Sequence, residues 1–237
     1  MSQQKAHLTE DWLKGFPDTD LGDAVRLMLA TWQRLRRDFP GACDPNLSEP
    51  EITATFCDHL FPDGEKAGLN GTFLYEVRRA KTHPETGKRI QPIRTDIEYR
   101  DTAITLPSGR RLAVIFEFKK LKNNDTSRTG YVGKKGMQRF LTGDYKDHAE
   151  YVAFMVGLVH DEAQAAIAAI EARLKRAGTR DLLHIRPDDS GRHVLKPSAW
   201  FPESVHFDTV HSRTTQINAA EHSKFSDLVL CHVFLEH

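Results

Sequence analysis

The stretch TDIEYRDTAITLPSGRRLAVIFEFKKL, at residues 95–121, decides the fold that we expect for this chain. Two runs of β-forming residues are joined there by a Pro-Ser-Gly turn at residues 107–109, and this pattern predicts a hairpin. Asp96 opens the first run, and Glu117 and Lys119 are two positions apart near the end of the second. Residues two apart on a strand point to the same face. We therefore expect the Glu117 carboxylate and the Lys119 ammonium group to project together, with Asp96 brought alongside by the hairpin.

The opposite face of the second strand carries a continuous apolar row, formed by Leu112, Val114, Phe116 and Phe118. Such a row is typical of a strand that packs against helices. A Glu-x-Lys pair on a strand usually marks a solvated edge, but here the pair is embedded in an apolar run. The charged pair is therefore expected to lie against a packed wall.

Length and composition favour one α/β domain over residues 1–237. The hydrophobic content of 39% is enough for a core, and 33 basic residues balance 33 acidic ones. The overall charge thus indicates neither a nucleic-acid nor a membrane partner. The N-terminus has no apolar signal-peptide core, and no apolar run approaches the roughly 20 residues of a membrane span. We expect a cytoplasmic protein without a membrane partner.

The three cysteines argue against a disulfide framework. Cys43, Cys57 and Cys231 are odd in number and form no Cys-x-x-Cys pair. The same spacing argues against a thiolate zinc site. Buried, reduced thiols are expected.

Periodicity and breaker residues predict a central mixed sheet flanked by helices. Helices are expected at residues 20–39, 48–61, 136–146 and 161–177. Besides the two runs of the hairpin, strands are expected at residues 72–81, 151–159, 206–213 and 227–234. The run at 151–159 is almost wholly apolar, which predicts a central strand buried on both faces. The last two strands are expected to form an added antiparallel pair.

Breakers and loop residues set further expectations. A Pro-Asp-Gly sequence at 62–64 is expected to end the second helix, and Gly178 to end the last one. Residues 120–136 are rich in Asn, Lys and Gly and have no apolar periodicity. This segment is expected to be a long mobile loop that covers a substrate.

Two groups of residues outside the hairpin leave alternatives open. Glu51, in the first turn of the second helix, either completes a metal site or closes a capping box with Ser48. His211 and His232 are expected to meet across the C-terminal strand pair. They are either satisfied structural histidines or the ligands of a zinc hydrolase.

The hairpin residues suit phosphodiester hydrolysis. Two carboxylates can bind a hard divalent cation through oxygen atoms, while an adjacent ammonium group orients or stabilises the attacking water. At these residues the chain resembles the PD-(D/E)xK nuclease superfamily, which has the restriction-endonuclease-like fold. The motif falls on Asp96, Glu117 and Lys119, and Thr95 replaces the proline that often precedes the aspartate.

The resemblance covers roughly residues 48–177 and implies roles for further residues. It implies that Asp96 and Glu117 bind Mg²⁺ or Mn²⁺ and that Lys119 positions and activates the water. It matches Glu51 to an additional acidic metal ligand and Gln138 to a glutamine that orients water or a phosphate. It leaves the first forty-odd residues and the C-terminal sixty unexplained.

Local charge favours a nucleic-acid substrate. The segment from Arg78 to Arg139 contains sixteen basic residues and six acidic ones. Basic side chains around a cleft would bind backbone phosphates without reading bases, although such residues are also common on solvated strand edges. The candidate contacts after the motif are Lys120, Lys122, Arg128, Lys134, Lys135 and Arg139.

The function expected from these features is that of a metal-dependent nuclease, with DNA favoured over RNA by the frequency of DNA substrates in the superfamily. The resemblance suggests an effector or subunit of a bacterial defence system, which acts as a homo-oligomer or with a partner ATPase or helicase. The alternative is a module of the same fold that binds nucleic acid or a partner without catalysis.

Overall fold

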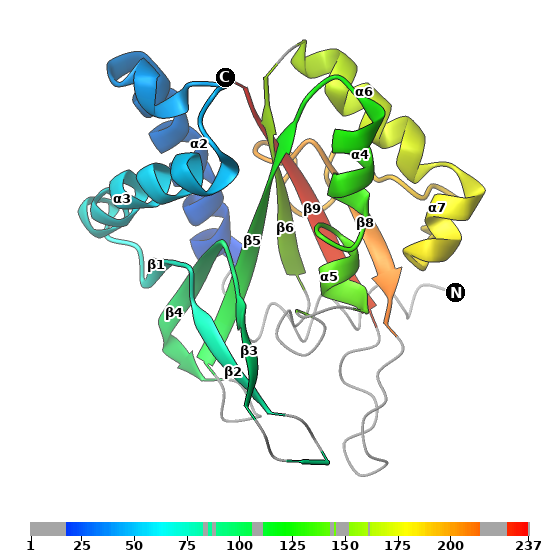
Figure 1. The fold of residues 1–237 in the computed structure, drawn as a ribbon, viewed down its shortest axis with the longest axis horizontal. Coiled ribbons are helices and arrows are strands. Elements are labelled where there is room, and N and C mark those ends of the chain that lie inside the picture. Colours follow the sequence, from blue (N-terminus) through cyan, green and yellow to red (C-terminus); the bar gives the residue numbers. More distant parts are fainter. Residues whose placement is uncertain are drawn as a thin grey trace.

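The computed structural model describes residues 18–82, 85, 86, 89–105, 111–142, 145, 152–160, 162–213 and 227–236. Figure 1 shows a central twisted sheet with helices on both faces. The predicted α/β class, with a mixed sheet flanked by helices, is confirmed. Among the helices of the described ranges, none is long and apolar enough to cross a membrane.

The main sheet has seven strands in the order β1-β4-β5-β6-β9-β8-β7. The strands are β1 (Gly71–Tyr75), β4 (Ile97–Thr105), β5 (Arg111–Leu121), β6 (Val152–Val159), β7 (Ile185–Arg186), β8 (Phe207–Ser212) and β9 (Asp227–Glu236). Strands β5, β6 and β9 are parallel neighbours, and all other neighbours are antiparallel. A separate two-stranded sheet is formed by β2 (Arg78–Thr82) and β3 (Arg89–Arg94).

Helices cover both faces of the main sheet. They are α2 (Asp18–Asp38), the 3-10 helix η1 (Pro40–Cys43), α3 (Glu49–Ala67), α4 (Asp125–Val132), α5 (Gln138–Leu141), α6 (Ala163–Leu174) and α7 (Ala177–Leu182). Helices α2 and α3 share one hydrophobic core with the sheet, and α4, α5 and α6 share a second core on the other face. The alternation of side chains along each strand separates the two cores.

The apolar row of the predicted hairpin packs as expected at three of its four positions, and the side chain of Leu112 lies outside what the structure describes. Val114, Phe116 and Phe118 of β5 lie in the core beneath α2 and α3. The ring of Phe118 lies 6.0 Å from that of Phe56 on α3, and Phe116 stacks on Phe154 of β6 at 4.6 Å. β4 and β5 pair antiparallel as predicted, and the turn at 107–109 lies outside the described residues.

The two most apolar strands lie at the centre of the sheet. Every residue of β6 is buried, which confirms the prediction of a central strand. β8 and β9 pair antiparallel as predicted, but they are not an addition to the sheet. β9 is the parallel neighbour of β6 and lies inside the sheet, and the burial of its side chains on both faces is typical of such a strand.

The predicted strand at 72–81 is instead two strands. The backbone of Glu76 has a φ of 49°, in the left-handed region, and this residue separates β1 from β2. Such a backbone bends the chain away from the direction of the first strand. β1 therefore pairs with β4 in the main sheet, whereas β2 pairs with β3.

The second helix does not end at the Pro-Asp-Gly sequence. α3 continues through Pro62 to Ala67 and ends at Gly68, whose φ of 70° is typical of a glycine C-cap. Contacts with α2 support the extra turn, since Asp63 accepts hydrogen bonds from Thr31 at 2.8 Å and Arg34 at 2.7 Å. Tertiary packing here outweighs the helix-breaking tendency of proline.

The expected mobile loop contains a helix. α4 begins after Asn124, whose side chain accepts a hydrogen bond from the Ser127 backbone N–H at 2.8 Å. Tyr131 and Val132 near its end are buried in the core. The N-cap and two buried side chains therefore outweigh the polar composition, and the prediction of a long mobile loop is wrong.

Two predicted helices are shorter than expected. The helix at 136–146 is reduced to α5, which the structure describes for four residues. The helix at 161–177 ends at Leu174, and Gly178 belongs to the separate helix α7. Residues 175 and 176 join α6 to α7, so the chain turns before the glycine that was expected to end the helix.

Gly136 tests the α4–α5 connection. A Cβ atom at this residue would lie 1.9 Å from the carbonyl oxygen of Tyr131, so Gly136→Ala must displace the backbone. We expect the free energy of unfolding to fall by about 1–3 kcal/mol. Gly130→Ala is the matched control, because a Cβ there meets nothing within 4 Å and alanine favours the helix by about 0.5–1 kcal/mol. Urea unfolding measures both, and equal effects of the two substitutions would contradict this packing.

Candidate functional site

The hairpin brings the motif residues together at one end of β5. Asp96 directly precedes β4, and Ile97 of β4 pairs with Phe116 of β5. The Asp96 carboxylate accepts a hydrogen bond from the Phe118 backbone N–H at 2.8 Å. Because Glu117 and Lys119 flank Phe118, this bond holds Asp96 beside both of them.

Lys119 lies at the centre of the site. Its Nζ atom is 2.9 Å from Glu117 Oε1, 2.8 Å from Glu49 Oε1 and 3.8 Å from Asp96 Oδ2. It also donates a hydrogen bond to the Phe118 carbonyl oxygen. We call Glu49, Asp96, Glu117 and Lys119 the carboxylate–lysine cluster. Its members come from α3, the start of β4 and the end of β5.

Glu117 is fully buried and is held by three donors. Besides Lys119, Arg139 Nη1 donates to Oε1 at 2.8 Å, and Tyr145 Oη donates to Oε2 at 2.7 Å. The Arg139 guanidinium group also stacks over the Tyr145 ring at 3.9 Å. Arg139 Nη2 donates a second bond to the Arg94 carbonyl oxygen at 2.9 Å, and Tyr145 Oη lies 2.8 Å from the same oxygen. A buried carboxylate is tolerated only when paired in this way.

The acidic residue that α3 contributes to the cluster is Glu49 rather than Glu51. Glu49 accepts from Lys119 Nζ and, through Oε2, from the Lys120 backbone N–H at 2.8 Å. Glu51 is exposed and closes the capping box, accepting from the Ser48 backbone N–H at 2.8 Å. Both glutamates lie in the first helical turn, and only the docking of α3 on β5 distinguishes them.

The helix after β5 contributes Arg139 to the site. Gln138 begins α5 and is half-buried, but the next residue, Arg139, forms the bond to Glu117. No local pattern in the sequence distinguishes Arg139 as a partner of Glu117, and the same holds for Tyr145. Both assignments depend on how α5 and Tyr145 pack against the end of β5.

The six basic residues expected to bind nucleic acid divide into two groups. Lys122, Lys134 and Lys135 are exposed. The others make internal contacts: Lys120 donates to the Pro45 and Leu47 carbonyl oxygens, Arg128 lies near Asn123 and Asp125, and Arg139 holds Glu117. Exposed charge near the cluster is therefore smaller than the sequence suggests.

The cluster changes the proton affinities of its members. Burial raises the pKa of Asp96 to about 7, and Glu117 adds to this rise while Lys119 opposes it. Burial alone would lower the pKa of Lys119. The surrounding carboxylates, Glu117 first, outweigh burial and raise the pKa of Lys119 above its ordinary value. Lys119 is therefore protonated at neutral pH, whereas Asp96 titrates near neutrality.

The donor atoms of the cluster suit a hard divalent cation in type. Carboxylate oxygens and the Phe118 carbonyl oxygen surround one positive charge, that of Lys119, and Mg²⁺ prefers oxygen ligands. Within the described ranges, no three His, Cys, Asp or Glu side chains are already grouped to hold a metal ion. The candidate ligands are Asp96 and Glu117. A bound metal ion and the Lys119 ammonium group would then both contact these two carboxylates.

The two histidines of β8 and β9 do not contact each other directly. Thr209 Oγ1 lies between them, 2.7 Å from His211 Nε2 and 3.0 Å from His232 Nε2. Their other ring nitrogens bond to the Leu183 carbonyl oxygen and the Tyr131 hydroxyl group. Burial lowers the pKa of both histidines. Full burial and four satisfied nitrogens favour the structural interpretation over a zinc site.

The cysteines agree with the prediction of buried, reduced thiols. Cys43, Cys57 and Cys231 are all free and buried. Burial raises the pKa of each thiol, so none is an activated nucleophile.

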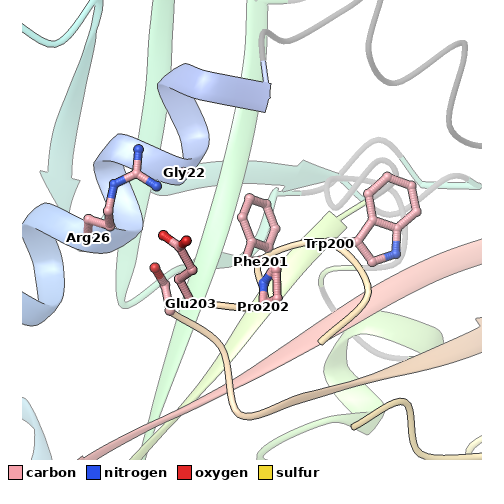
Figure 2. Close-up of a pocket in the computed structure, with 7 residues that line it drawn as sticks. Gly22, Arg26, Trp200, Phe201, Pro202 and Glu203 are labelled. Atoms are coloured by element: carbon pink, nitrogen blue, oxygen red, sulfur yellow. The ribbon is translucent and has the colours of Figure 1, made fainter. Parts of the chain in front are cut away.

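A pocket of about 230 Å³ lies elsewhere on the molecule (Figure 2). Gly22 and Arg26 of α2 form one wall, and residues 200–204, before β8, form the other. None of the lining residues belongs to the carboxylate–lysine cluster, and Arg26 is paired with Asp23. The pocket therefore adds nothing to the chemistry of the cluster.

Comparisons of this chain with protein-family models, curated proteins and solved structures found no match.

Asp96→Asn tests the raised pKa of Asp96 through stability. The folded-state pKa of about 7 lies above the ordinary value of 3.8, so the neutral carboxyl group stabilises the fold at low pH. This contribution is lost as the pH rises through 7. The free energy of unfolding of the parent should therefore fall relative to that of Asp96→Asn, by at most about 1.4 kcal/mol per pH unit. Urea unfolding in EDTA between about pH 5 and 8 measures the difference.

Asp63→Asn is the control for this pH dependence. Burial alone raises the pKa of Asp63, but hydrogen bonds from Arg34 and Thr31 outweigh it and lower the pKa. Its stabilising contribution is lost only as the pH falls below the ordinary value. The difference between parent and Asp63→Asn should therefore stay constant over the same range. A constant difference for Asp96→Asn would contradict the raised pKa.

Proposed function

We propose that this protein is a metal-dependent nuclease of the restriction-endonuclease-like type, which hydrolyses phosphodiester bonds with Mg²⁺ or Mn²⁺. The observation that carries the proposal is the convergence of Asp96, Glu117 and Glu49 on Lys119 at the end of β5. Three carboxylates around one amine are more than an ion pair at a strand edge requires. DNA is the favoured substrate, by the frequency of DNA substrates in the superfamily that the motif resembles.

Asp96 and Glu117 would hold the metal ion. When bound, the ion lowers the pKa of a coordinated water and neutralises charge on the phosphate. Asp96 has a pKa of about 7, so it must lose a proton near neutrality to serve as a ligand. The residue titrates in the range in which a nuclease of the cytoplasm would operate.

Lys119 would act as a positive charge and a hydrogen-bond donor. Its raised pKa keeps the ammonium group protonated, so it cannot accept the proton of the attacking water. It can orient that water and stabilise the charge that develops on the phosphate oxygens. Glu49 restrains the Nζ atom from one side, which fixes the direction of the donor.

A second candidate is a binding module of the same fold without catalysis. The observation in its favour is the completeness of the bonds around Glu117, whose two oxygens already accept from Lys119, Arg139 and Tyr145. A fully satisfied buried carboxylate is also what a structural ion-pair network requires. Cleavage and binding assays separate the two candidates.

Lys119→Ala and Glu117→Gln test the nuclease proposal. We expect the parent to cleave duplex DNA with Mg²⁺ or Mn²⁺ but not in EDTA. Each substitution should lower the cleavage rate by about 10²–10³-fold, because Lys119→Ala removes a positive charge that would stabilise the transition state and Glu117→Gln removes a charged ligand of the metal ion. Gel-based cleavage rates measure the effect, and Mn²⁺ binding by electron paramagnetic resonance should be lost in Glu117→Gln.

Lys175→Ala is the matched control for Lys119→Ala. Lys175 is exposed at the end of α6 and should leave the cleavage rate unchanged. Undiminished cleavage by Lys119→Ala and Glu117→Gln would reject the site assignment. A parent that binds DNA in a salt-sensitive manner but does not cleave it would favour the binding module.

Glu49→Gln and Glu51→Gln test which glutamate of α3 serves the site. Glu49→Gln weakens the ion pair with Lys119, so cleavage should fall by about tenfold or more. Glu51→Gln keeps an oxygen for the Ser48 backbone N–H, so both the capping box and cleavage should be retained. Cleavage rates measured under the same conditions decide the matter, and the reverse order of effects would restore Glu51 as the metal ligand.

A further inference from the structure

β2 and β3 form a two-stranded arm that is separate from the main sheet. The strands pair antiparallel from Arg78 opposite Arg94 to Thr82 opposite Arg89. Figure 1 shows them running together away from the seven-stranded sheet. We call β2 and β3 the basic arm because of their Arg and Lys side chains.

The two strands of the arm carry positive charge only, and Glu85 lies in the connection between them. The strands themselves, RRAKT and RIQPIR, contain no acidic residue. The five basic positions are Arg78, Arg79, Lys81, Arg89 and Arg94. The whole chain has no net charge, so the positive charge of the arm is a local excess. A two-stranded ribbon with one sign of charge is complementary to a polyanion rather than to an average protein surface.

The root of the arm is bonded to the carboxylate–lysine cluster. The Glu76 backbone N–H donates to the Asp96 carbonyl oxygen at 3.0 Å, and the Thr95 N–H donates to Val77 O at 3.2 Å. These bonds join the arm to the β1–β4 pair immediately before Asp96. The carbonyl oxygen of Arg94, the last residue of β3, accepts from Arg139 Nη2 and lies 2.8 Å from Tyr145 Oη, and both of these side chains hold Glu117.

The side chains at the root also set the direction of the arm. Glu76 has a left-handed backbone and forms an ion pair with Arg94 at 2.9 Å. A non-glycine residue in this conformation costs on the order of 1 kcal/mol, which the surrounding contacts must offset. The bend is therefore held in place, and a polymer bound along the arm would lie beside the cluster.

We propose that the basic arm enters the major groove of double-stranded DNA and delivers a phosphodiester backbone to the cluster. The major groove of B-DNA is about 12 Å wide and admits a two-stranded ribbon. The major groove of A-form RNA is deep and narrow and does not. The inference rests on the proposed function only in taking nucleic acid as the polymer. It adds the element that would bind the duplex and the groove that this element would enter.

The test compares two triple variants in DNA binding. The arm variant carries Arg79→Gln, Lys81→Gln and Arg89→Gln, and the control carries Lys66→Gln, Lys175→Gln and Arg176→Gln at exposed helix ends. Fluorescence anisotropy with a DNA duplex in EDTA measures binding without cleavage. The arm variant should bind about tenfold or more weakly, and its slope of log affinity against log salt should fall by about three. The control should match the parent.

A measurement on the parent protein guards against a misfolded variant. Acetylation of lysines is followed by mass spectrometry with and without duplex DNA. Lys81 should be protected by DNA, whereas Lys66 and Lys175 should react equally in both samples. Equal reactivity of Lys81 with and without DNA would overturn the proposal, and so would an unchanged salt slope of the arm variant or an equal loss in the control.

The choice of duplex distinguishes groove binding from simple charge attraction. A DNA duplex should bind more tightly than an RNA duplex of the same sequence, and the arm variant should lose this preference. Equal binding of both duplexes by the parent would overturn groove entry. Arm-dependent DNA binding by a parent that never cleaves would reject the nuclease while retaining the arm. Cleavage by a parent whose DNA binding does not depend on the arm would reject the arm and retain the nuclease.

Discussion

The buried carboxylate of Glu117 is the constraint on which the site depends. A charged group without exposure costs several kcal/mol unless donors surround it. Lys119, Arg139 and Tyr145 supply those donors. Each arrives on a different part of the chain, so the need to satisfy one carboxylate fixes the end of β5, the start of α5 and Tyr145 relative to one another. The Arg94 carbonyl oxygen joins the same network and ties in the end of β3.

The charge balance of the cluster follows from that constraint. Lys119 is shared among three carboxylates, and its positive charge and that of Arg139, which pairs with Glu117, are together one fewer than the three carboxylates. The shortfall appears at Asp96, the carboxylate farthest from Nζ, whose pKa rises to about 7 by burial and by the proximity of Glu117. A site with unmatched negative charge and only oxygen ligands favours a hard cation near neutral pH. The packing of the sheet, by burying these carboxylates, thus favours the proposed metal chemistry.

The basic arm and the cluster are two parts of one structural unit. The arm leaves the sheet at Glu76 and returns at Asp96, so its root contains the residue that would bind the metal. The charges of the two parts are opposite in sign. In the proposed function, positive charge on the arm would attract a polyanion over a distance, whereas the carboxylates would bind a cation at close range. This division would allow a neutral chain to approach a nucleic acid and still hold a divalent ion.

The sequence by itself determined the alternation of β5, the central place of β6 and the neighbourhood of Asp96, Glu117 and Lys119, because strand periodicity and a short hairpin are local properties. Only the tertiary structure decided which side chains from other parts of the chain reach that site. Glu49 and Glu51 differ by two positions in one helical turn, and the docking of α3 on β5 selects Glu49. Burial of Tyr131 and Val132 stabilises a helix in a polar segment. Contacts with α2 allow α3 to continue beyond Pro62. These outcomes depend on contacts between residues that are distant in the chain. Local propensity and spacing do not predict such contacts.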